Sequence, residues 1–426
     1  MKIAAIVLTG GKVRPNTKRK SFDSFGFLGL HMVMDDIIKE GHSVDYCTLA
    51  TVKDYDIALL SITAPEDITT FLKSIKNGEY KKGGCFVVSG GAGCINICSI
   101  YDFIDMAVFG RAEGQALKII EKQKAENIWV KKDDPNIDRE YTVRQVRNLH
   151  DEEGGSCGCK NKCFFCQYTW VRKLVGKNYS AGGDGYTVNE EDFKSLCIDK
   201  PGRYTTGIDG LSYKTRKRVN KGFVTDELIR EKFENAIAKG HEKAIMLKLF
   251  GIVGYPWETI HTAREDADNF GRLFDGINER HTKGRLMAAM HLTPFSPEPL
   301  TPMEHVPVNV KTNWRSVFGG KSYPLINNDR INVFIGPYTT TEPTLSRRVL
   351  INRCRINERD KIFKIVTSKL EGVSGYEIHN KVNTYLKRDV FGWQIPGDIV
   401  PFLKTYSDYT KIGNKFFKSN KSAMVE

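Results

Sequence analysis

The sequence predicts an α/β protein with two parallel sheets and a basic, mainly helical C-terminal region. Short apolar runs alternate with helical patterns over residues 2–125, and this alternation is typical of a parallel sheet covered on both faces. It returns over residues 203–292, where it is typical of part of a β/α barrel. We therefore predict a doubly wound, Rossmann-like domain over 1–125, a linker over 126–150, a partial β/α core over 151–305, and a basic region over 306–426.

The N-terminal part contains five candidate strands and three candidate helices. The strands are the short apolar runs Ile3–Leu8, Ser43–Thr48, Ile57–Ile62, Cys85–Ser89 and Met106–Phe109. The helices have apolar residues at helical spacing and cover Phe27–Glu40, Pro65–Lys76 and Glu113–Lys122. The second helix has a favourable start, because proline fits its first turn and Glu66 and Asp67 lie at the positive end of its dipole.

Beyond a polar linker and a cysteine-rich segment, the alternation of strands and helices resumes. The predicted elements are a strand at Arg203–Asp209, a helix at Thr225–Lys239, a strand at Ala244–Gly254, a helix at Trp257–Leu273 and a strand at Arg285–Leu292. The C-terminal region carries two predicted basic helices, Leu345–Leu370 and Tyr376–Arg388, before a polar tail.

Composition and hydropathy indicate an ordinary soluble protein. The chain of 426 residues is 40% hydrophobic and 27% charged, and its length allows two or three domains. The apolar run Ile3–Leu8 is followed by Thr-Gly-Gly-Lys without a cleavage-site pattern, so a buried first strand is favoured over a signal peptide. No stretch approaches the ~18 apolar residues of a transmembrane helix. We expect a cytoplasmic protein without a membrane partner.

The net charge of +13 is concentrated near the C-terminus. Residues 306–426 contain 20 Lys and Arg against 10 Asp and Glu. Such a region favours a polyanionic partner, with DNA or tRNA first, although a solvated lysine-rich surface has the same composition. The cations expected to meet phosphates are Arg347, Arg348, Arg353, Arg355, Arg359, Lys361 and Lys364, and the aromatic residues nearby are Tyr338, Tyr376, Tyr385, Trp393, Tyr406 and Tyr409.

Four of the ten cysteines lie within ten positions, at Cys157, Cys159, Cys163 and Cys166. In a chain without an export signal, such a group indicates metal or redox chemistry rather than disulfides. Counted from Cys159, the spacing is C-x3-C-x2-C, which can place three thiolates around a 4Fe–4S cluster and leave one iron without a protein ligand. Structural zinc, with Cys157 as a fourth ligand, and buried thiols or an unrelated cluster are the alternatives.

The segment around these cysteines resembles the cluster loop of radical S-adenosylmethionine (SAM) enzymes. In that family an aromatic residue, here Phe165, precedes the third cysteine and lies against the adenine. Downstream, Gly254-Tyr255-Pro256-Trp257-Glu258-Thr259 is similar to the family's G-x-P-x-E-T turn, which forms part of the SAM site. The stretches that complete the likeness are Thr206–Ser212 with Arg218–Gly222, and the proline-rich Pro294–Pro302.

The resemblance implies a 4Fe–4S cluster held by Cys159, Cys163 and Cys166, bound SAM, and a reductant such as flavodoxin or ferredoxin. The residues implied at the SAM site are Phe165, Asp209, Gly254, Pro256 and Glu258, with Gly182, Gly183 and Asp184 as a near match to the Gly-Gly-Glu turn that binds the SAM amine. A flexible glycine loop explains this last segment almost as well. Only about 36 residues separate Cys166 from Arg203, where the family's barrel has two further strand–helix units, so a trimmed barrel is expected.

Three strand ends of the N-terminal domain resemble a cobalamin-binding domain, which precedes the radical core in one subfamily. A doubly wound domain binds ligands beyond the carboxyl ends of its strands, and small residues there let a large planar ligand approach the backbone. The positions implied are Ser61 and Thr63, Gly90 and Gly91, and Gly110 and Glu113. No Asp-x-His-x-x-Gly sequence is present to supply a cobalt ligand. Cobalamin binding and a retained but empty domain both remain open.

The resemblance implies that a 5′-deoxyadenosyl radical modifies the substrate, by C-methylation if cobalamin binds and by rearrangement if it does not. A nucleic-acid base is the expected substrate. The alternatives are an enzyme of small-molecule or peptide natural-product biosynthesis and a non-catalytic iron–sulfur protein that binds nucleic acid. Cys354, whose two arginine neighbours would lower the pKa of its thiol, and Cys157 are candidate catalytic residues, with an inert packed cysteine as the alternative.

Overall fold

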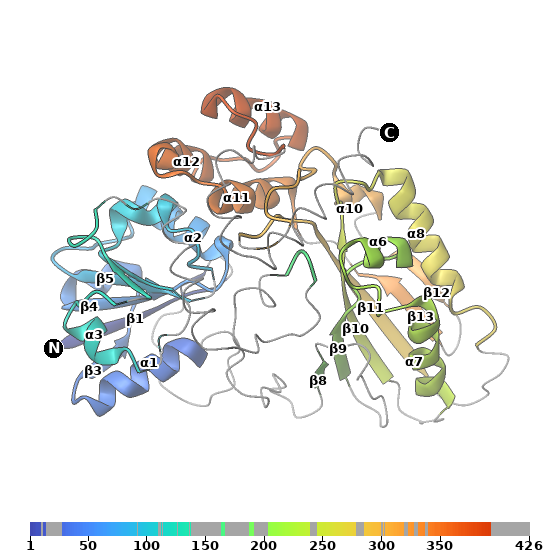
Figure 1. Cartoon of the computed structure of the whole chain (residues 1–426), viewed down its shortest axis with the longest axis horizontal. Coiled ribbons are helices and arrows are strands. Elements are labelled where there is room, and N and C mark those ends of the chain that lie inside the picture. Colours follow the sequence, from blue (N-terminus) through green and yellow to red (C-terminus); the bar gives the residue numbers. More distant parts are fainter. Residues whose placement is uncertain are drawn as a thin grey trace.

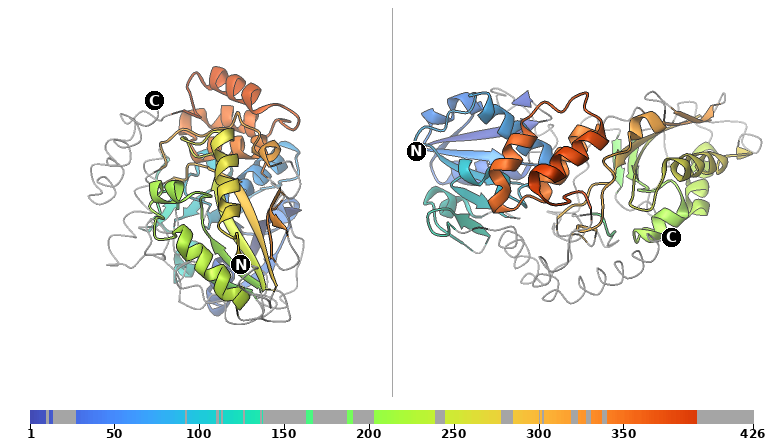
Figure 2. Two further views of the ribbon diagram at one scale, coloured as in Figure 1. Left: turned by 90° about the vertical axis from the view of Figure 1, so that its right-hand side faces the viewer. Right: turned by 90° about the horizontal axis from the view of Figure 1, so that it is seen from above.

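The computed structural model contains two β-sheets, one in each half of the chain, with the C-terminal helices placed between them at the top of the molecule (Figure 1). The view from above shows the same arrangement (Figure 2). The structure describes residues 1–9, 12–13, 28–91, 93–109, 112, 114–125, 127–135, 137, 163–166, 187–190, 203–238, 245–277, 285–299, 301, 303–318, 323–327, 331–336 and 340–392.

The first sheet is built around strand β1. Its parallel strands have the order β3-β1-β4-β5-β6, and β2 and β7 are antiparallel additions. The strands are β1 Lys2–Thr9, β2 Lys12–Val13, β3 Ser43–Tyr46, β4 Ile57–Ser61, β5 Phe86–Gly90, β6 Met106–Val108 and β7 Ile128–Val130. Because the chain leaves β1 first to one side and then to the other, the sheet changes winding direction between β1 and β4.

Helices cover both faces of this sheet. They are α1 Leu28–Lys39, α2 Pro65–Lys76 and α3 Ala116–Ile120, with the 3-10 turns η1 Leu49–Asp54 and η2 Cys98–Phe103. Ile3 on β1 packs with α1 and α3, whereas its neighbour Ala4 packs with α2 and η2 on the opposite face. Alternate residues of one strand point to opposite faces, so strands β4 and β6 are buried throughout, whereas β3 at the edge alternates between exposed and half-buried residues. The five predicted strands and three predicted helices of residues 1–125 are confirmed to within a few residues, whereas β2 and β7 were not predicted.

The second sheet has a simpler order. Its strands are β8 Thr187–Glu190, β9 Arg203–Gly207, β10 Ile245–Val253, β11 Leu286–Pro294, β12 Tyr323–Asn327 and β13 Ile331–Ile335. Strands β8, β9, β10, β11 and β13 are parallel and lie side by side in sequence order, and β12 is antiparallel at one edge. Sequential parallel strands are the arrangement found in a β/α barrel, and among the described strands this sheet is open.

Helices cover one face of the second sheet. They are α6 Tyr213–Arg218, α7 Asp226–Ala238, α8 Ile260–Arg272 and the short α10 Trp314–Val317, and α7 and α8 lie along the outer side of the strands in Figure 2. On β10, Leu247 and Leu249 are buried with Phe233 of α7 and Phe270 of α8. Phe250, the residue after Leu249, is 39% exposed on the opposite face. The burial pattern of β10 therefore alternates with period two, as expected for a strand covered on one side only.

The C-terminal helices pack on the first sheet's helices. They are α11 Glu342–Asn352, the turn η3 Ile356–Glu358, α12 Arg359–Val366 and α13 Gly375–Leu386. One continuous apolar core joins them to the N-terminal half, where Val349 of α11 and Ile362 of α12 share it with Phe71 of α2. The C-terminal helices therefore cover a face of the first sheet's layer.

The predicted continuous helix Leu345–Leu370 is wrong. Helix α11 ends at Asn352, and a separate helix α12 begins at Arg359. The side-chain amide of Asn96 donates to the backbone oxygens of Ile351, Asn352 and Cys354 at 3.1, 3.2 and 3.0 Å. Carbonyl groups at a helix end need partners outside the helix, and a side chain from the N-terminal half supplies one here. Residues 345–370 by themselves carry no sign of that partner.

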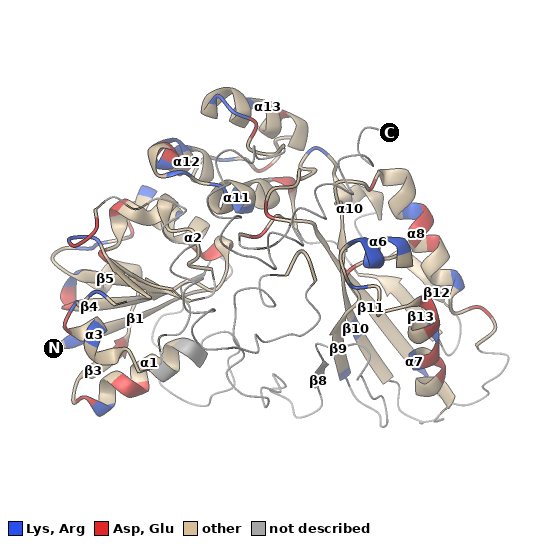
Figure 3. Cartoon of the chain, in the orientation of Figure 1, with Lys and Arg blue, Asp and Glu red and all other residues tan. Residues whose placement is uncertain are grey.

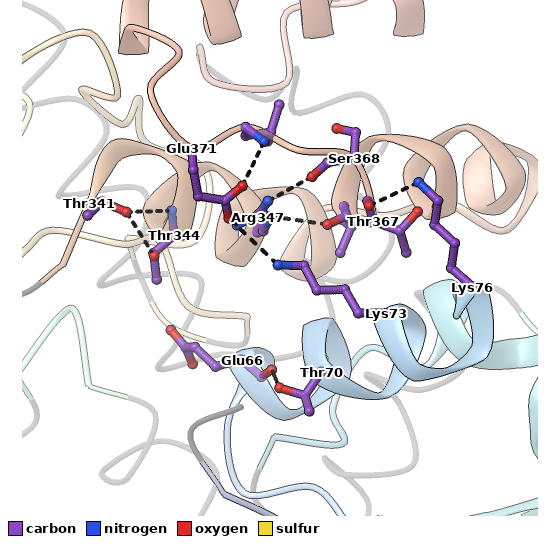
Figure 4. A network of polar contacts seen from close by, with 12 residues as sticks. Glu66, Thr70, Lys73, Lys76, Thr341, Thr344, Arg347, Thr367, Ser368 and Glu371 are labelled. Carbon is purple, nitrogen blue, oxygen red and sulfur yellow. Dashed lines mark hydrogen bonds and ion pairs between the residues drawn. The ribbon is translucent and has the colours of Figure 1, made fainter. Parts of the chain in front are cut away.

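Polar contacts reinforce the packing of the C-terminal helices on α2 (Figure 4). The guanidinium of Arg347 donates to the backbone oxygen of Ser368 at 2.9 Å and to the carboxylate of Glu371 at 3.0 Å. From α2, Lys73 reaches the same carboxylate at 3.7 Å, and Lys76 donates to the backbone oxygen of Thr367 at 3.2 Å. Two lysines of one helix are thus held by the segment that follows α12.

No helix in the described part of the chain is long and apolar enough to cross a membrane.

Candidate active site

A tight turn holds two of the predicted cluster cysteines. The backbone N–H of Cys166 donates to the backbone oxygen of Cys163 at 3.2 Å, which closes a four-residue turn. Phe164 within this turn donates its N–H to Val219 at 3.0 Å and accepts the N–H of Met303 at 3.2 Å. The turn is thus fixed by backbone bonds to two distant segments. Cys163 is buried and Cys166 is half-buried, whereas Cys157 and Cys159 lie outside the described residues.

An aromatic cluster lies behind the cysteine turn. The ring of Phe165 is 6.4 Å from that of Tyr255, which stacks on Trp257 at 5.1 Å and meets Phe295 at 5.2 Å. Met303 is buried in the same apolar group. Three strands contribute to it, because Tyr255 follows β10, Phe295 follows β11, and the hydroxyl of Tyr255 donates to Asp209 after β9 at 2.9 Å. The cysteine turn therefore lies at the carboxyl ends of β9, β10 and β11, where sheets of this type bind their ligands.

The turn after β10 closes around a buried carboxylate. One oxygen of Glu258 accepts the backbone N–H groups of Gly254 and Tyr255 at 2.7 and 3.2 Å, and the other accepts the hydroxyl of Thr215 at 3.2 Å. Gly254 has φ +81°, and a Cβ there would lie 2.7 Å from the indole nitrogen of Trp314. Glycine is therefore required at this position for both its conformation and its space. Glu258 holds the turn, and Pro256 lies within it, half-buried.

Burial raises the pKa of Glu258 to about 7, although its three hydrogen bonds oppose the shift. Because the folded state keeps this proton to a higher pH than the unfolded state, the resulting stability is present below about pH 4.5 and is lost as the pH rises to about 7. In Glu258→Gln the amide oxygen keeps both backbone bonds, and the amide N–H can donate to Thr215. Urea unfolding at pH 4.5 to 8 is expected to show that this loss is absent in the variant, which gains up to roughly 3 kcal/mol over wild type above pH 7.

The pKa of Glu371 is shifted in the opposite direction from that of Glu258. A hydrogen bond from Arg347 lowers the pKa of Glu371 to about 2, so its contribution is present above about pH 4.5 and is lost as the pH falls. Glu371→Gln is therefore expected to lose stability at neutral pH, where Glu258→Gln gains it. Parallel stability profiles for Glu258→Gln and wild type between pH 4.5 and 7 would contradict the raised pKa of Glu258.

A buried ion pair lies beside the cysteine turn. The ammonium of Lys221 pairs with the carboxylate of Asp209, and the side chains are 6% and 16% exposed. Burial opposes the charged lysine, but Asp209 and the thiols of Cys163 and Cys166 together raise the pKa of Lys221. Asp209 was predicted at this site. Lys221 was not predicted at this site, although it lies in the segment Arg218–Gly222, which resembles the radical SAM family.

Three segments that are distant in the sequence thus meet at one place. The cysteine turn, the end of β9 with Asp209, and the turn Gly254–Glu258 lie within one network of hydrogen bonds, ring contacts and charges. The arrangement offers two thiols, a buried cation and an aromatic wall. Among the described residues no group of three or more His, Cys, Asp and Glu could hold a metal ion. The third predicted cluster ligand, Cys159, and the predicted SAM turn Gly182–Asp184 lie outside those residues.

No protein-family model matches the chain, and no curated protein matches it. Among solved structures, the chain is similar to the cobalamin-dependent S-adenosylmethionine radical enzyme OxsB with aqua-cobalamin bound. The identity is 12% and the TM-score 0.36, over 66% of this chain and 56% of that one. The chain therefore spans little more than half the length of OxsB, and a likeness this weak does not place it in a family.

The loops predicted to receive cobalamin pack against each other. Gly91 has φ +105°, and a Cβ there would lie 2.5 Å from the backbone oxygen of Ile62. A Cβ on Gly93 would lie 2.6 Å from the backbone of Ala64. The hydroxyl of Thr63 donates to the carboxylate of Asp67 at 2.7 Å. These small residues therefore allow close contact between two loops.

Two other predicted cobalamin positions lie at the carboxyl ends of strands. Ser61 ends β4 and is buried, and Gly90 ends β5 and accepts the backbone N–H of Ile62 at 2.8 Å. Gly110 and Glu113 lie outside the described residues. Cobalamin binding stays a prediction.

Cys354 lies in the apolar core that joins the C-terminal helices to the N-terminal half, far along the chain from the cysteine turn. Burial raises the pKa of its thiol well above the ordinary value, with the neighbouring Cys98 and Glu358 acting in the same direction. The expectation that flanking arginines lower this pKa is therefore wrong. Arg353 points its guanidinium at four backbone oxygens, and the cations near Cys354 do not offset its enclosure.

Most arginines of the predicted basic helix make contacts within the protein. Arg347 bonds the segment after α12, Arg348 pairs with Glu66 at 2.7 Å, and Arg359 pairs with Asp102 at 2.7 Å. Basic and acidic residues are mixed along α12 and α13 (Figure 3). The exposed cations of these helices are mainly lysines, at Lys364, Lys369, Lys381 and Lys387. Tyr338, Trp393, Tyr406 and Tyr409 lie outside the described residues.

Proposed function

We propose that this protein is a radical SAM enzyme whose 4Fe–4S cluster is held by Cys159, Cys163 and Cys166. The observation that carries the proposal is convergence. The cysteine turn, the Asp209 segment and the Gly254–Glu258 turn resemble motifs of one enzyme family, and they meet at the carboxyl ends of three adjacent strands. Buried thiols or a structural zinc site would not require the other two segments to gather around the cysteines.

The residues present fit such a cluster. Cys163 and Cys166 offer thiolate ligands in a turn that backbone bonds hold open, and the cation of Lys221 lies beside them. A bound cluster with one open iron supplies the electron that cleaves SAM to methionine and a 5′-deoxyadenosyl radical. Phe165 and the turn that Glu258 holds would form the wall for SAM. The aromatic cluster behind them, in which Tyr255 and Phe295 are buried, would shield one side of the site from water.

Anaerobic reconstitution tests this proposal. The purified chain is incubated with iron and sulfide, reduced with dithionite in place of flavodoxin or ferredoxin, and given SAM. We expect the absorption and electron paramagnetic resonance of a 4Fe–4S cluster, and stoichiometric or greater formation of 5′-deoxyadenosine. A chain that binds nucleic acid and a cluster but forms no deoxyadenosine would be the non-catalytic alternative. Zinc in the purified protein without cluster formation would overturn the proposal.

The proposed substrate is a nucleic-acid base, reached through the C-terminal helices. What supports this is a pair of exposed tyrosines on α13, each with a lysine over its ring. Tyr376 is 61% exposed with Lys311 at 5.5 Å, and Tyr385 is 44% exposed with Lys361 at 5.8 Å. Exposed rings with nearby cations can stack on unpaired bases while the cations meet phosphates. An enzyme acting on a small molecule or a peptide would have no use for this surface.

Reversing three exposed lysines tests the substrate class without disturbing the internal arginines. In the triple variant Lys364→Glu, Lys381→Glu, Lys387→Glu, affinity for a single-stranded oligonucleotide is expected to fall. The slope of log K against log salt should decrease by up to about 0.7 for each phosphate that the variant no longer neutralises. The matched control carries Lys53→Glu, Lys81→Glu and Lys118→Glu, which are exposed on the N-terminal half. Equal decreases in both triple variants would show general electrostatics rather than a defined surface.

The proposed reaction is C-methylation if cobalamin binds to the N-terminal domain, and radical rearrangement of the substrate if it does not. Absorption of the protein after incubation with hydroxocobalamin and gel filtration separates the two outcomes. Retained cobalamin would favour C-methylation, and its loss would favour radical rearrangement of the substrate.

A further inference from the structure

The buried pair of Asp209 and Lys221 is placed to act on the cysteine turn. Asp209 follows β9 and Lys221 follows α6, so the pair joins two loops at the carboxyl end of the second sheet. Two bonds connect these loops to the cysteine turn and its aromatic wall. Phe164 donates its N–H to Val219 at 3.0 Å, and the Tyr255 hydroxyl donates to the backbone oxygen of Asp209 at 2.9 Å.

The two charges of the pair have opposite electrostatic effects on the cysteine turn. The Asp209 carboxylate pairs with the ammonium of Lys221 and raises its pKa, and Cys163 and Cys166 in their thiolate forms act in the same direction. The side chain of Lys221 is only 6% exposed, so water screens its charge poorly. A charge enclosed in this way acts on its neighbours more strongly than a surface charge at the same distance.

Stability alone does not account for such a pair. Removing two charges from water costs about as much as their attraction returns, and apolar replacements of buried pairs are often neutral or stabilising. Reduction makes an iron–sulfur cluster more negative by one charge, and nearby charge is among the properties that set its potential. A fixed cation stabilises the reduced form, and a fixed anion opposes it.

We propose that Lys221 and Asp209 tune the reduction potential of the cluster held by the cysteine turn, with Lys221 raising the potential and Asp209 limiting that rise. The inference rests on the proposed function, since it requires a bound cluster. Both are positioning residues, because they act through the thiolates that ligate iron. One electron enters the cluster from dithionite, and no bond to either residue forms or breaks.

The test is a redox titration of the reconstituted protein without SAM, followed by electron paramagnetic resonance. Lys221→Gln is expected to lower the ratio of reduced to oxidised cluster at a fixed potential at least tenfold, a shift of about 59 mV for one electron. Asp209→Asn is expected to change the ratio in the opposite direction. Asp209 has φ +53°, and asparagine tolerates this left-handed conformation, so the backbone of the loop is kept.

Two further variants complete the design. The double variant Asp209→Asn, Lys221→Gln is expected to return towards the wild-type potential. Lys217→Gln removes the same charge from an exposed position on α6, and its shift should be small because water screens it. Circular dichroism verifies that each variant is folded. If Lys221→Gln does not fold or binds no cluster, the upward shift in Asp209→Asn still decides the question.

The outcomes separate the inference from the function on which it rests. Opposite shifts in the two single variants support the inference, because a purely structural pair would not give opposite signs. Unchanged potentials, or shifts of the same sign, overturn it while a cluster in the wild-type protein leaves the proposed function standing. A wild-type protein that binds no cluster overturns both.

Discussion

Cys163→Ala is expected to abolish cluster binding and to reduce 5′-deoxyadenosine formation to background. The substitution removes one of three proposed thiolate ligands and leaves two, too few to hold a cluster on one loop. Residues that merely orient metal ligands change affinity about 10–100-fold, so removal of a ligand itself should cost at least about 100-fold. The turn should persist, because backbone groups of Phe164 and Cys166 make its bonds.

Two other cysteines serve as matched controls. Cys85 is a buried free thiol in the first sheet's layer, and burial raises its pKa to about 12. Cys85→Ala should therefore keep the iron content and the deoxyadenosine yield of the wild type. Cys354→Ala tests the remaining catalytic candidate, and we expect it to cleave SAM normally. The cluster assignment would fail if Cys163→Ala kept its iron and its activity while either control lost them.

The local elements of this fold are well predicted from sequence, because burial imposes a regular pattern on them. The inner strands of the first sheet are covered on both faces and consist of continuous apolar runs, as Ile57–Ser61 does. On β10, the alternation around Lys248 and Phe250 identifies a strand covered on one face. Strands β2, β7, β8, β12 and β13 were not predicted, although β13 alternates between buried and half-buried residues.

The placement of the C-terminal helices could not be predicted in the same way. Their apolar faces fit any partner, and the partner is α2 with η2, about 250 residues away along the chain. For a related reason, the count of formal charges did not show that several arginines of these helices are buried. An arginine has the same formal charge on a surface or in a core, but Arg347 and Arg353 each bond several backbone oxygens and are at most 6% exposed.

At the candidate site, the sequence motifs identify residues, and the structure adds their contacts within the protein. The oxygens of Glu258 hold the turn that carries Gly254 and Tyr255, which the motif alone does not show. Gly91 lies against a neighbouring loop, and its role towards a ligand stays a prediction. In both cases a residue type suited to a ligand is equally suited to backbone groups of the protein. Lys221 was overlooked because a lone lysine has no spacing rule.

Arg353→Met is expected to be the most destabilising substitution in the C-terminal helices. Its guanidinium donates to the backbone oxygens of Val390, Gly392, Glu304 and Val306 at 2.8, 3.1, 3.0 and 2.7 Å. Methionine fills similar space but donates nothing, so four enclosed carbonyls lose a partner at about 1–3 kcal/mol each. A decrease of about 4 kcal/mol or more is a large part of the roughly 5–15 kcal/mol that typically stabilises a protein.

The matched control is Lys364→Met, which removes the same charge from an exposed position on α12 and should change stability by no more than about 0.5 kcal/mol. Urea unfolding gives the stability of both variants, and limited proteolysis reports whether the segment around Val390 detaches in Arg353→Met. Both substitutions remove one positive charge. If Arg353 binds nucleic acid, its substitution should weaken oligonucleotide binding, whereas if it is an internal anchor, its substitution should lower stability. Normal stability with weakened oligonucleotide binding in Arg353→Met would return this arginine to the surface. Destabilisation of that variant alone identifies Arg353 as the residue that fixes 304–306 and 390–392 to α11.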